Sequence, residues 1–313
     1  MDNSPDFLMI LLASFRIGSI AALINTTVSG EGLKHVINIS NVKLIIAGAS
    51  HLSKLTNALE NSDLINLPLF SIEDSERIPA EFKDLKDLSK QFSTFDPYEP
   101  VMKDVAAYIF TSGTTGLPKA ALVDHAKLVK GSFAGHFLCF NFKTKDRLYM
   151  TLPLYHSTGL VLGWAASLRS GCANIIKPKF SASEFWDDVK KYKANKFIYV
   201  GELCRYLMNL PASETDKSNS IVQISGNGLR PDIWDSFQKR FNIKKIVEIY
   251  GATEAVGMTV NSFGRSGMIG RKRSDSTIFH CNKDDGSPIL NEQGYCTKIS
   301  EGETGLYIQK ISS

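Results

Sequence analysis

The sequence predicts an α/β fold built on a largely parallel β-sheet. Short runs of apolar, β-branched and aromatic residues recur along the chain, which is typical of buried strands. Stretches with the apolar spacing of helices separate most of these runs. Strands that alternate with helices usually pair in parallel, because each helix returns the chain to the starting edge. We expect strands at residues 42–47, 105–110, 147–152, 173–176, 196–200, 221–224 and 245–249.

Three helices are predicted from signals at their first residues. A proline and an aspartate precede the mostly apolar residues 7–24, which we interpret as a buried helix rather than a membrane span. A serine and a glutamate three residues later have the spacing of a capping box at the start of residues 181–192. A proline opens residues 231–241, where it suits the first helical turn.

The character of the sequence changes toward its C-terminal end. Residues 262–304 are rich in Gly, Ser, Asn and charged residues. Strand candidates there are residues 276–280 and 305–311. We therefore predict two parts, an α/β body over residues 1–257 and a small β-rich section over residues 258–313.

Composition is that of an ordinary globular protein and argues against several classes. The 313 residues can bury a sizeable core, with 43% hydrophobic and 22% charged residues. A net charge of +4 is too small to suggest a nucleic-acid partner. The five cysteines lack the close paired spacing of a zinc site and are odd in number, so we expect reduced thiols rather than disulfides.

The strongest indication of function is the loop at residues 111–119. It reads Thr-Ser-Gly-Thr-Thr-Gly-Leu-Pro-Lys and follows the predicted buried strand at 105–110. Its glycines let the backbone approach a bound group, and its hydroxyls and ammonium group add donors, which suits a polyphosphate. Because Lys119 follows Gly116 by three residues, the loop does not match a P-loop, and a P-loop NTPase is disfavoured. The other alternative is an ordinary surface turn.

A second candidate site is residues 250–254, which read Tyr-Gly-Ala-Thr-Glu after a predicted strand. Ligands of open α/β sheets gather outside the carboxyl ends of the strands. The Glu254 carboxylate suits Mg²⁺, the Thr253 hydroxyl suits a phosphate, and the Tyr250 ring suits a purine. Alone, these residues are more typical of a loop and a helix cap. Beside the 111–119 loop, we favour the ligand site.

Two further positions follow apolar runs. Gly226, Asn227 and Gly228 suit a backbone that lies against a flat ligand, and His156 ends an apolar segment. By themselves, residues 226–228 indicate an ordinary turn, and His156 indicates a structural histidine.

The 111–119 loop resembles the signature of the adenylate-forming enzymes, which include acyl-CoA synthetases, luciferases and amino-acid-activating domains. Further segments stand in the order that this family has: residues 152–156 (Leu-Pro-Leu-Tyr-His), 201–207 (Gly-Glu-Leu-Cys-Arg-Tyr-Leu), 226–230 (Gly-Asn-Gly-Leu-Arg) and 250–254. Two of them, with residues 180–188, resemble the fatty acid transport protein, or very-long-chain acyl-CoA synthetase, branch. The resemblance extends over nearly the whole chain.

The resemblance implies that ATP and Mg²⁺ serve the activation of a fatty acid, with coenzyme A as co-substrate of a second step. The catalytic residues that it implies are Lys119, His156, Thr253 and Glu254, with Glu254 as the metal ligand. The nucleotide-binding residues that it implies are Thr111, Ser112, Gly113, Thr114, Thr115, Gly116, Gly226, Asn227, Gly228, Tyr250 and Gly251.

The resemblance also implies an architecture and a location. The fold would be the large N-terminal domain of these enzymes, with mainly parallel sheets flanked by helices, without its first part and without the small C-terminal lid domain. Full-length members of this branch are expected at the cytosolic face of the endoplasmic reticulum or plasma membrane. This chain has no clear transmembrane segment, and alone it could be cytosolic.

Two functions are consistent with these features. One is a long- or very-long-chain fatty acid–CoA ligase linked to fatty acid uptake. The other is a non-catalytic nucleotide- or acyl-binding remnant that acts through partners. An amino-acid-activating domain is disfavoured, because the segments typical of the fatty-acid branch are present.

Overall fold

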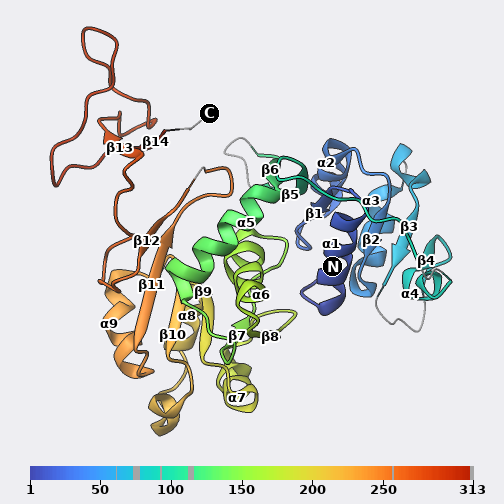
Figure 1. Cartoon of the computed structure of the whole chain (residues 1–313), viewed down its shortest axis with the longest axis horizontal. Coiled ribbons are helices and arrows are strands. Elements are labelled where there is room, and N and C mark those ends of the chain that lie inside the picture. The colour runs from blue at the N-terminus through green and yellow to red at the C-terminus, as the bar shows by residue number, and fades with distance from the viewer. Residues whose placement is uncertain (61, 73–77, 92–93, 112–115, 256, 311–313) are drawn as a thin grey trace.

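The chain adopts the α/β fold that the sequence predicts (Figure 1). A computed structural model describes residues 1–60, 62–72, 78–91, 94–111, 116–255 and 257–310. Within those ranges the strands form four sheets. We name them the main sheet (β7 to β12), the loop sheet (β1, β5 and β6), the N-terminal sheet (β2 to β4) and the terminal hairpin (β13 and β14).

The main sheet has the strand order β12-β11-β10-β9-β7-β8. Its neighbouring strands pair in parallel, except that β12 is antiparallel to β11. The predicted strands in this region are confirmed, with ends that shift by a few residues, and the sheet continues past residue 257 through β12. The strands are β7 (Arg147–Met150), β8 (Ala173–Ile176), β9 (Lys196–Val200), β10 (Gln223–Asn227), β11 (Lys245–Tyr250) and β12 (Thr259–Asn261).

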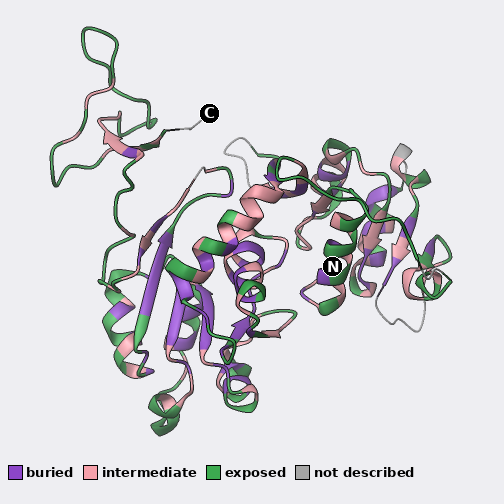
Figure 2. Cartoon of the chain, in the orientation of Figure 1, coloured by how far each residue is buried: buried purple, intermediate pink, exposed green. Residues whose placement is uncertain are grey.

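Helices pack against the main sheet through apolar faces. Phe185 and Val189 of α7 and Trp234 and Phe237 of α9 are buried in the same core as the strands. Figure 2 shows that the central strands of the sheet are buried, whereas the outer faces of the helices are exposed. Pro231 occupies the first turn of its helix, as predicted. The helices are α7 (Ala182–Tyr192), α8 (Gly201–Met208) and α9 (Pro231–Arg240), and the short η5 (Glu214–Ser218) lies between the last two in sequence.

The capping box predicted at the start of α7 is not formed. Ser181 precedes the helix with extended backbone, but its side chain makes no capping hydrogen bond. The Ser181 hydroxyl lies 3.2 Å from the Ser183 hydroxyl, and a Glu184 carboxylate oxygen lies 3.5 Å from the Lys177 ammonium nitrogen. Both members of the predicted box therefore have other partners.

The apolar run at residues 7–24 forms a helix and then a strand, so the prediction of a helix over the whole run is wrong. Helix α1 (Pro5–Arg16) begins after Ser4, whose hydroxyl accepts a hydrogen bond from the amide of the third helical residue. Gly18 has a φ of +71°, a conformation that favours glycine and ends the helix. Strand β1 (Ala21–Leu23) then pairs in parallel with β5, which satisfies its backbone groups. Among the described residues, no helix is both long and apolar enough to cross a bilayer.

The loop sheet carries the 111–119 loop. It consists of β1, β5 (Val105–Thr111) and β6 (Lys119–Asp124), with β5 at its centre. β5 and β6 are antiparallel, so Thr111 lies opposite Lys119 across the hairpin. Helix α5 (His125–Ala134) starts directly after β6, and the predicted strand at 105–110 is confirmed.

Helix α5 crosses a second helical segment at close range. A β-carbon at Gly135 would lie 2.7 Å from the Ala166 β-carbon and 2.8 Å from the Leu162 carbonyl oxygen. Only glycine therefore permits this distance between the two backbones. The crossing segments are the π-helical η3 (Gly135–Phe140), which continues α5, and the π-helical η4 (Thr158–Ala165), which continues as α6 (Ala166–Ser170).

The N-terminal sheet is a parallel sheet with its own small core. The strand predicted at residues 42–47 is confirmed only for its second half, which forms β2. The strands are β2 (Ile45–Ala47), β3 (Leu69–Ser71) and β4 (Phe82–Asp84). The helices around them are α2 (Gly30–Ser40), η1 (Ala49–His51), α3 (Leu52–Leu59), η2 (Asp63–Asn66) and α4 (Leu85–Ser89).

The terminal hairpin lies apart from the main sheet, at the end of a long connection (Figure 1). It pairs β13 (Ser276–Phe279) with β14 (Leu306–Gln309) in antiparallel fashion. Both strands were predicted in this region, although residue 311, the last of the predicted strand, lies outside the described residues.

Gly135→Ala is expected to lower the free energy of unfolding by about 1–3 kcal/mol, because the added methyl group meets backbone at the helix crossing. Urea unfolding followed by circular dichroism measures this change. Gly32→Ala on α2 is the matched control. The added methyl there meets only the end of the Val28 side chain, and the greater helix propensity of alanine should leave stability unchanged or slightly raised. Equal effects of the two substitutions would contradict the steric argument.

Candidate functional site

The segment after β11 is the point at which distant parts of the chain meet. The Thr111 hydroxyl, at the end of β5, donates a 2.5 Å hydrogen bond to a Glu254 carboxylate oxygen. The Thr253 hydroxyl lies 2.9 Å from the Ser157 hydroxyl, and the Thr253 carbonyl accepts a hydrogen bond from the Lys127 ammonium group. Thr253 is buried and Glu254 is exposed, so the first anchors the segment and the second faces solvent.

The pKa of the Glu254 carboxyl is lowered by this environment. The hydrogen bond from Thr111 is the largest cause, followed by the backbone amide of Glu254 itself. The positive charge of Lys127 and the charge that His156 can carry act in the same direction, whereas partial burial opposes them. Glu254 is therefore ionised at neutral pH. Mg²⁺ commonly binds one or two carboxylates and completes its shell with phosphate and water, so this single exposed carboxylate fits such an ion.

Part of the 111–119 loop can be placed beside Glu254. Thr111 contacts Glu254 directly, and Lys119 lies across the hairpin from Thr111 with its side chain exposed. Gly116 has a φ of +114°, which favours glycine at this turn. The other predicted phosphate-binding residues, Ser112, Gly113, Thr114 and Thr115, lie outside the described residues.

His156 lies in the turn after β7, within electrostatic reach of Glu254. Its ring is accessible to solvent, but the surrounding protein lowers its pKa by desolvation, while the Glu254 carboxylate acts in the opposite direction. The imidazole is therefore mainly neutral near pH 7. The Thr158 amide donates to Nδ1 at 3.3 Å, which favours the tautomer with its proton on Nε2.

Asn3 fixes the turn that carries His156. Its side-chain amide donates a 2.9 Å hydrogen bond to the Leu152 carbonyl, and its side-chain oxygen accepts a 2.8 Å hydrogen bond from the Leu154 amide. Asn3 is buried, and it lies about 150 residues away in sequence from the turn that it holds. The position of His156 therefore depends on the first residues of the chain.

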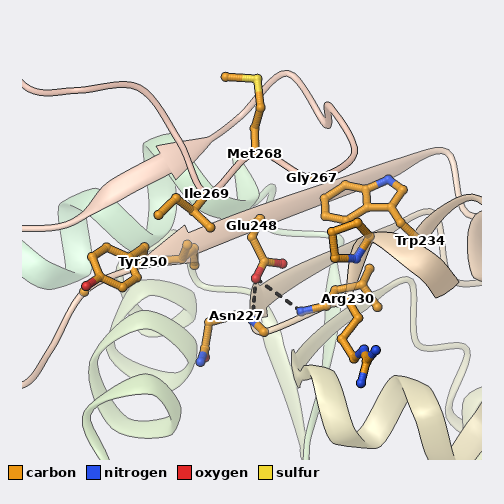
Figure 3. A pocket seen from close by; sticks show the side chains of 13 residues that line it. Asn227, Arg230, Trp234, Glu248, Tyr250, Gly267, Met268 and Ile269 are labelled. Carbon is orange, nitrogen blue, oxygen red and sulfur yellow. Dashed lines mark hydrogen bonds between the residues drawn. The ribbon is translucent and has the colours of Figure 1, made fainter. Parts of the chain in front are cut away.

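A cavity of about 440 Å³ opens at the carboxyl ends of β10 and β11 (Figure 3). Figure 3 shows Tyr250 at one end of the cavity and Trp234 at the other, with Asn227 below. The Tyr250 ring is 50% exposed and so is available to stack on a flat group. Gly226, which precedes Asn227 in β10, is buried, and a β-carbon there would lie 2.0 Å from the Tyr199 carbonyl oxygen. The lining includes Asn227, Gly228, Arg230, Trp234, Tyr250, Gly251 and Met268.

Glu248 organises the wall of this cavity. One of its carboxylate oxygens accepts hydrogen bonds from the Gly228 and Leu229 amides, and the other accepts one from the Tyr199 hydroxyl (Figure 3 draws the first two). Gly228 has a φ of +81°, so the two consecutive amides can point at one oxygen. Burial raises the pKa of Glu248, and its hydrogen bonds oppose that rise.

The site therefore has two adjoining parts. The cavity presents an aromatic ring, an amide side chain and glycine backbone at Asn227, Gly228, Tyr250 and Gly251. A few residues farther along the same segment, Glu254 contacts Thr111 of the loop sheet, and Thr253 contacts Ser157 and Lys127. A ligand with a flat ring and a polyphosphate chain matches this order of chemical groups.

Sequence reasoning missed four residues that shape the site: Asn3, Lys127, Ser157 and Glu248. Glu248 carried a usable signal, because an acid inside a predicted buried strand needs partners. The other three carried none, since their partners lie far away in sequence.

A family model described as AMP-binding enzyme matches residues 1–295. The chain belongs to the AMP-binding enzyme family. Curated relatives include human long-chain fatty acid transport protein 6, which is 35% identical over 100% of this chain and 52% of that protein. Another is the medium/long-chain-fatty-acid–CoA ligase FadD6 of Mycobacterium tuberculosis, 32% identical over 99% of this chain and 51% of that protein. The chain spans about half the length of the curated relatives it matches.

Several solved structures share the fold of this chain. The benzoate CoA ligase from Burkholderia xenovorans LB400 superposes with a TM-score of 0.81 at 17% identity, over 98% of this chain and 59% of that one. ATP-bound MatB from Rhodopseudomonas palustris superposes with a TM-score of 0.78 at 20% identity, over 98% of this chain and 58% of that one. The resemblance to the adenylate-forming enzymes and the predicted fold class are thereby confirmed.

Glu248→Ala is expected to lower the free energy of unfolding by about 2–4 kcal/mol, because it leaves the buried Leu229 amide and Tyr199 hydroxyl, and the Gly228 amide, without their acceptor. Glu248→Gln is the matched control, since its amide oxygen can still accept from the two backbone donors. Chemical denaturation of both variants checks the difference. Equal losses would mean that these hydrogen bonds do not stabilise the cavity wall.

Thr111→Val is expected to raise the pKa of Glu254 toward its usual value, because the largest cause of its depression is lost. Carbon-detected NMR titration of the glutamate carboxyls measures it. A depressed carboxyl pKa stabilises the fold above the unfolded-state pKa, and this contribution disappears as pH falls, so the variant should lose less stability on acidification. Ser157→Ala, which removes a contact to Thr253 instead, should leave the pKa in place. If the pKa of Glu254 rose equally in Thr111→Val and Ser157→Ala, its low value would not depend specifically on the hydrogen bond from Thr111.

Proposed function

We propose that this chain catalyses the ATP-dependent activation of a long- or very-long-chain fatty acid through an acyl-AMP intermediate. The main observation in support is the hydrogen bond between Thr111 and Glu254, a few residues from the cavity at Tyr250. It joins a loop suited to phosphates to a segment suited to a base and a divalent cation. The fatty acid as substrate is supported by the names of the relatives, which are fatty acid transport proteins and a fatty-acid–CoA ligase.

The reaction couples one bond formed to one bond broken. A carboxylate oxygen of the fatty acid attacks the α-phosphorus of ATP, and the bond from that phosphorus to the oxygen bridging the β-phosphate breaks. Acyl-AMP and pyrophosphate result. The protein contributes mainly by positioning the reactants and by neutralising charge.

Each part of the site has a role in this scheme. The cavity would take the adenine between Tyr250 and Asn227, along the backbone of Gly228 and Gly251. Gly226, buried next to Asn227, would let the strand backbone that carries Asn227 lie close to its neighbour. The 111–119 loop, including Thr111, Gly116 and Lys119 and the residues 112–115, would hold the β- and γ-phosphates.

The α-phosphate and the fatty acid would meet at the other residues. The Thr253 hydroxyl would donate to the α-phosphate, and His156 would lie near the attacking carboxylate. A neutral His156 with a proton on Nε2 can donate one hydrogen bond there without adding full charge. Glu254 would hold Mg²⁺, which when bound would neutralise part of the triphosphate charge.

A second step is proposed by analogy with the same relatives. Coenzyme A would take the acyl group from acyl-AMP, which gives acyl-CoA and releases AMP; the name of the FadD6 relative, a fatty-acid–CoA ligase, supports this step. By resemblance to the fatty acid transport proteins, the protein is proposed to act at the cytosolic face of the endoplasmic reticulum or plasma membrane.

ATP–pyrophosphate exchange in the presence of a long-chain fatty acid tests the proposal. We expect exchange by the chain and a loss of about 100-fold or more in Lys119→Ala and in Glu254→Ala, because each removes a charge that faces the phosphates. Lys103→Ala and Glu99→Ala, at exposed positions, are matched controls and should keep the activity.

Two results would contradict the proposal. Binding of ATP without any exchange would favour the alternative of a non-catalytic nucleotide- or acyl-binding remnant. Exchange with amino acids in place of fatty acids would reassign the substrate.

A further inference from the structure

Lys127 connects the loop sheet to the Thr253–Glu254 segment. Its backbone is fixed at the start of α5, where the Asp124 carboxylate caps the helix and accepts a 2.6 Å hydrogen bond from the Lys127 amide. Its ammonium group reaches across and donates a hydrogen bond to the Thr253 carbonyl. The two partners are 126 residues apart in sequence. The side chain is thus anchored at both ends.

The placement of Lys127 has an energetic cost. Burial lowers the pKa of its ammonium group, and the negative charges of Asp124 and Glu254 oppose that effect. Lysine on a helix surface ordinarily leaves its charge in water, because desolvation of an ammonium group is unfavourable. The half-buried ammonium group donates to the Thr253 carbonyl, and this hydrogen bond restricts the position of that carbonyl.

Lys127 acts on a segment that is also held elsewhere. The Thr253 carbonyl is bound by Lys127, the Thr253 hydroxyl by Ser157, and the Glu254 carboxylate by Thr111. Lys127 and Thr111 both belong to the β5–β6–α5 unit, so the unit that carries the phosphate loop contacts the segment at two points. Figure 1 shows α5 leading from β6 toward the main sheet. Of these contacts, the one from Lys127 alone fixes the main chain.

We propose that Lys127 is a positioning residue for a bound nucleotide: by holding the Thr253 main chain, it directs the Thr253 hydroxyl and the Glu254 carboxylate toward the phosphates. This inference rests on the proposed function, because it assumes that the segment faces a triphosphate. Lys127 differs from Lys119 in its role. Lys119 is exposed on the hairpin and is suited to touch phosphate itself, whereas Lys127 acts through Thr253.

Equilibrium titration of the whole chain with MgATP tests the role of Lys127 without requiring turnover. Lys127→Met should weaken MgATP binding about tenfold, since a hydrogen bond from a charged donor is lost. Lys127→Gln should also weaken it, because its shorter side chain does not reach the carbonyl. Lys127→Arg, which keeps the charge and the donor, should stay within about threefold of the wild type.

Lys130→Met is the matched control, since Lys130 is an exposed lysine on the same helix, and it should bind MgATP like the wild type. Thermal unfolding of each variant separates positioning from folding, because a purely structural role would lower the midpoint and leave the affinity unchanged. In the Lys127→Met background, Thr253→Val should weaken binding less than it does in the wild type, because the two residues act as one unit.

The outcomes distinguish this inference from the proposed function. A wild-type chain that binds no MgATP overturns both. Wild-type binding that is unchanged in Lys127→Met overturns the role of Lys127 alone. Should Lys127→Met not fold, unchanged binding by Lys127→Gln overturns it in the same way. Weakened binding in Met and Gln variants with recovery in Lys127→Arg supports it.

Discussion

The hydrogen bond between the Thr111 hydroxyl and the Glu254 carboxylate joins two parts of the chain that have separate sheets. The loop sheet brings the end of β5 to this point, and the main sheet brings the end of β11. Neither sheet alone supplies both the Thr111 hydroxyl and the Glu254 carboxylate. The geometry of the site therefore depends on how the two sheets are held together, which involves the close helix crossing at Gly135 and the reach of Lys127.

A second constraint lies within the main sheet. Glu248 is buried in β11, and its carboxylate gathers the amides that follow β10 and the hydroxyl of Tyr199 on β9. Three adjacent parallel strands are thereby tied together at their carboxyl ends. Burial of the acid is unfavourable by itself, and the hydrogen bonds offset that cost. The result is a wall of glycine backbone beside a flat cavity, in the place where α/β sheets usually bind ligands.

Much of the fold could be predicted because its signals are local. The strands at residues 173–176 and 196–200 have the predicted bounds, because each is a short, mostly apolar run that is visible in the sequence itself. Two local predictions were wrong because other partners were available to the residues concerned. The second half of residues 7–24 became β1 because an open edge of β5 was available to it. The capping box of Ser181 did not form because Ser183 and Lys177 engaged its members.

The sequence by itself determined the class of fold, the family and the chemical types in the site, because motifs such as residues 111–119 and 250–254 are contiguous and carry their chemistry with them. Only the tertiary structure decided which side chains hold those motifs in place. Asn3, Lys127 and Ser157 act on residues about 100 to 150 positions away. Periodicity and spacing report neighbours along the chain, whereas these contacts arise from the packing of sheets and helices. The sequence therefore predicts the chemical type of the 111–119 loop, whereas the contacts that hold the turn before His156 and the Thr253–Glu254 segment are seen only in the folded chain.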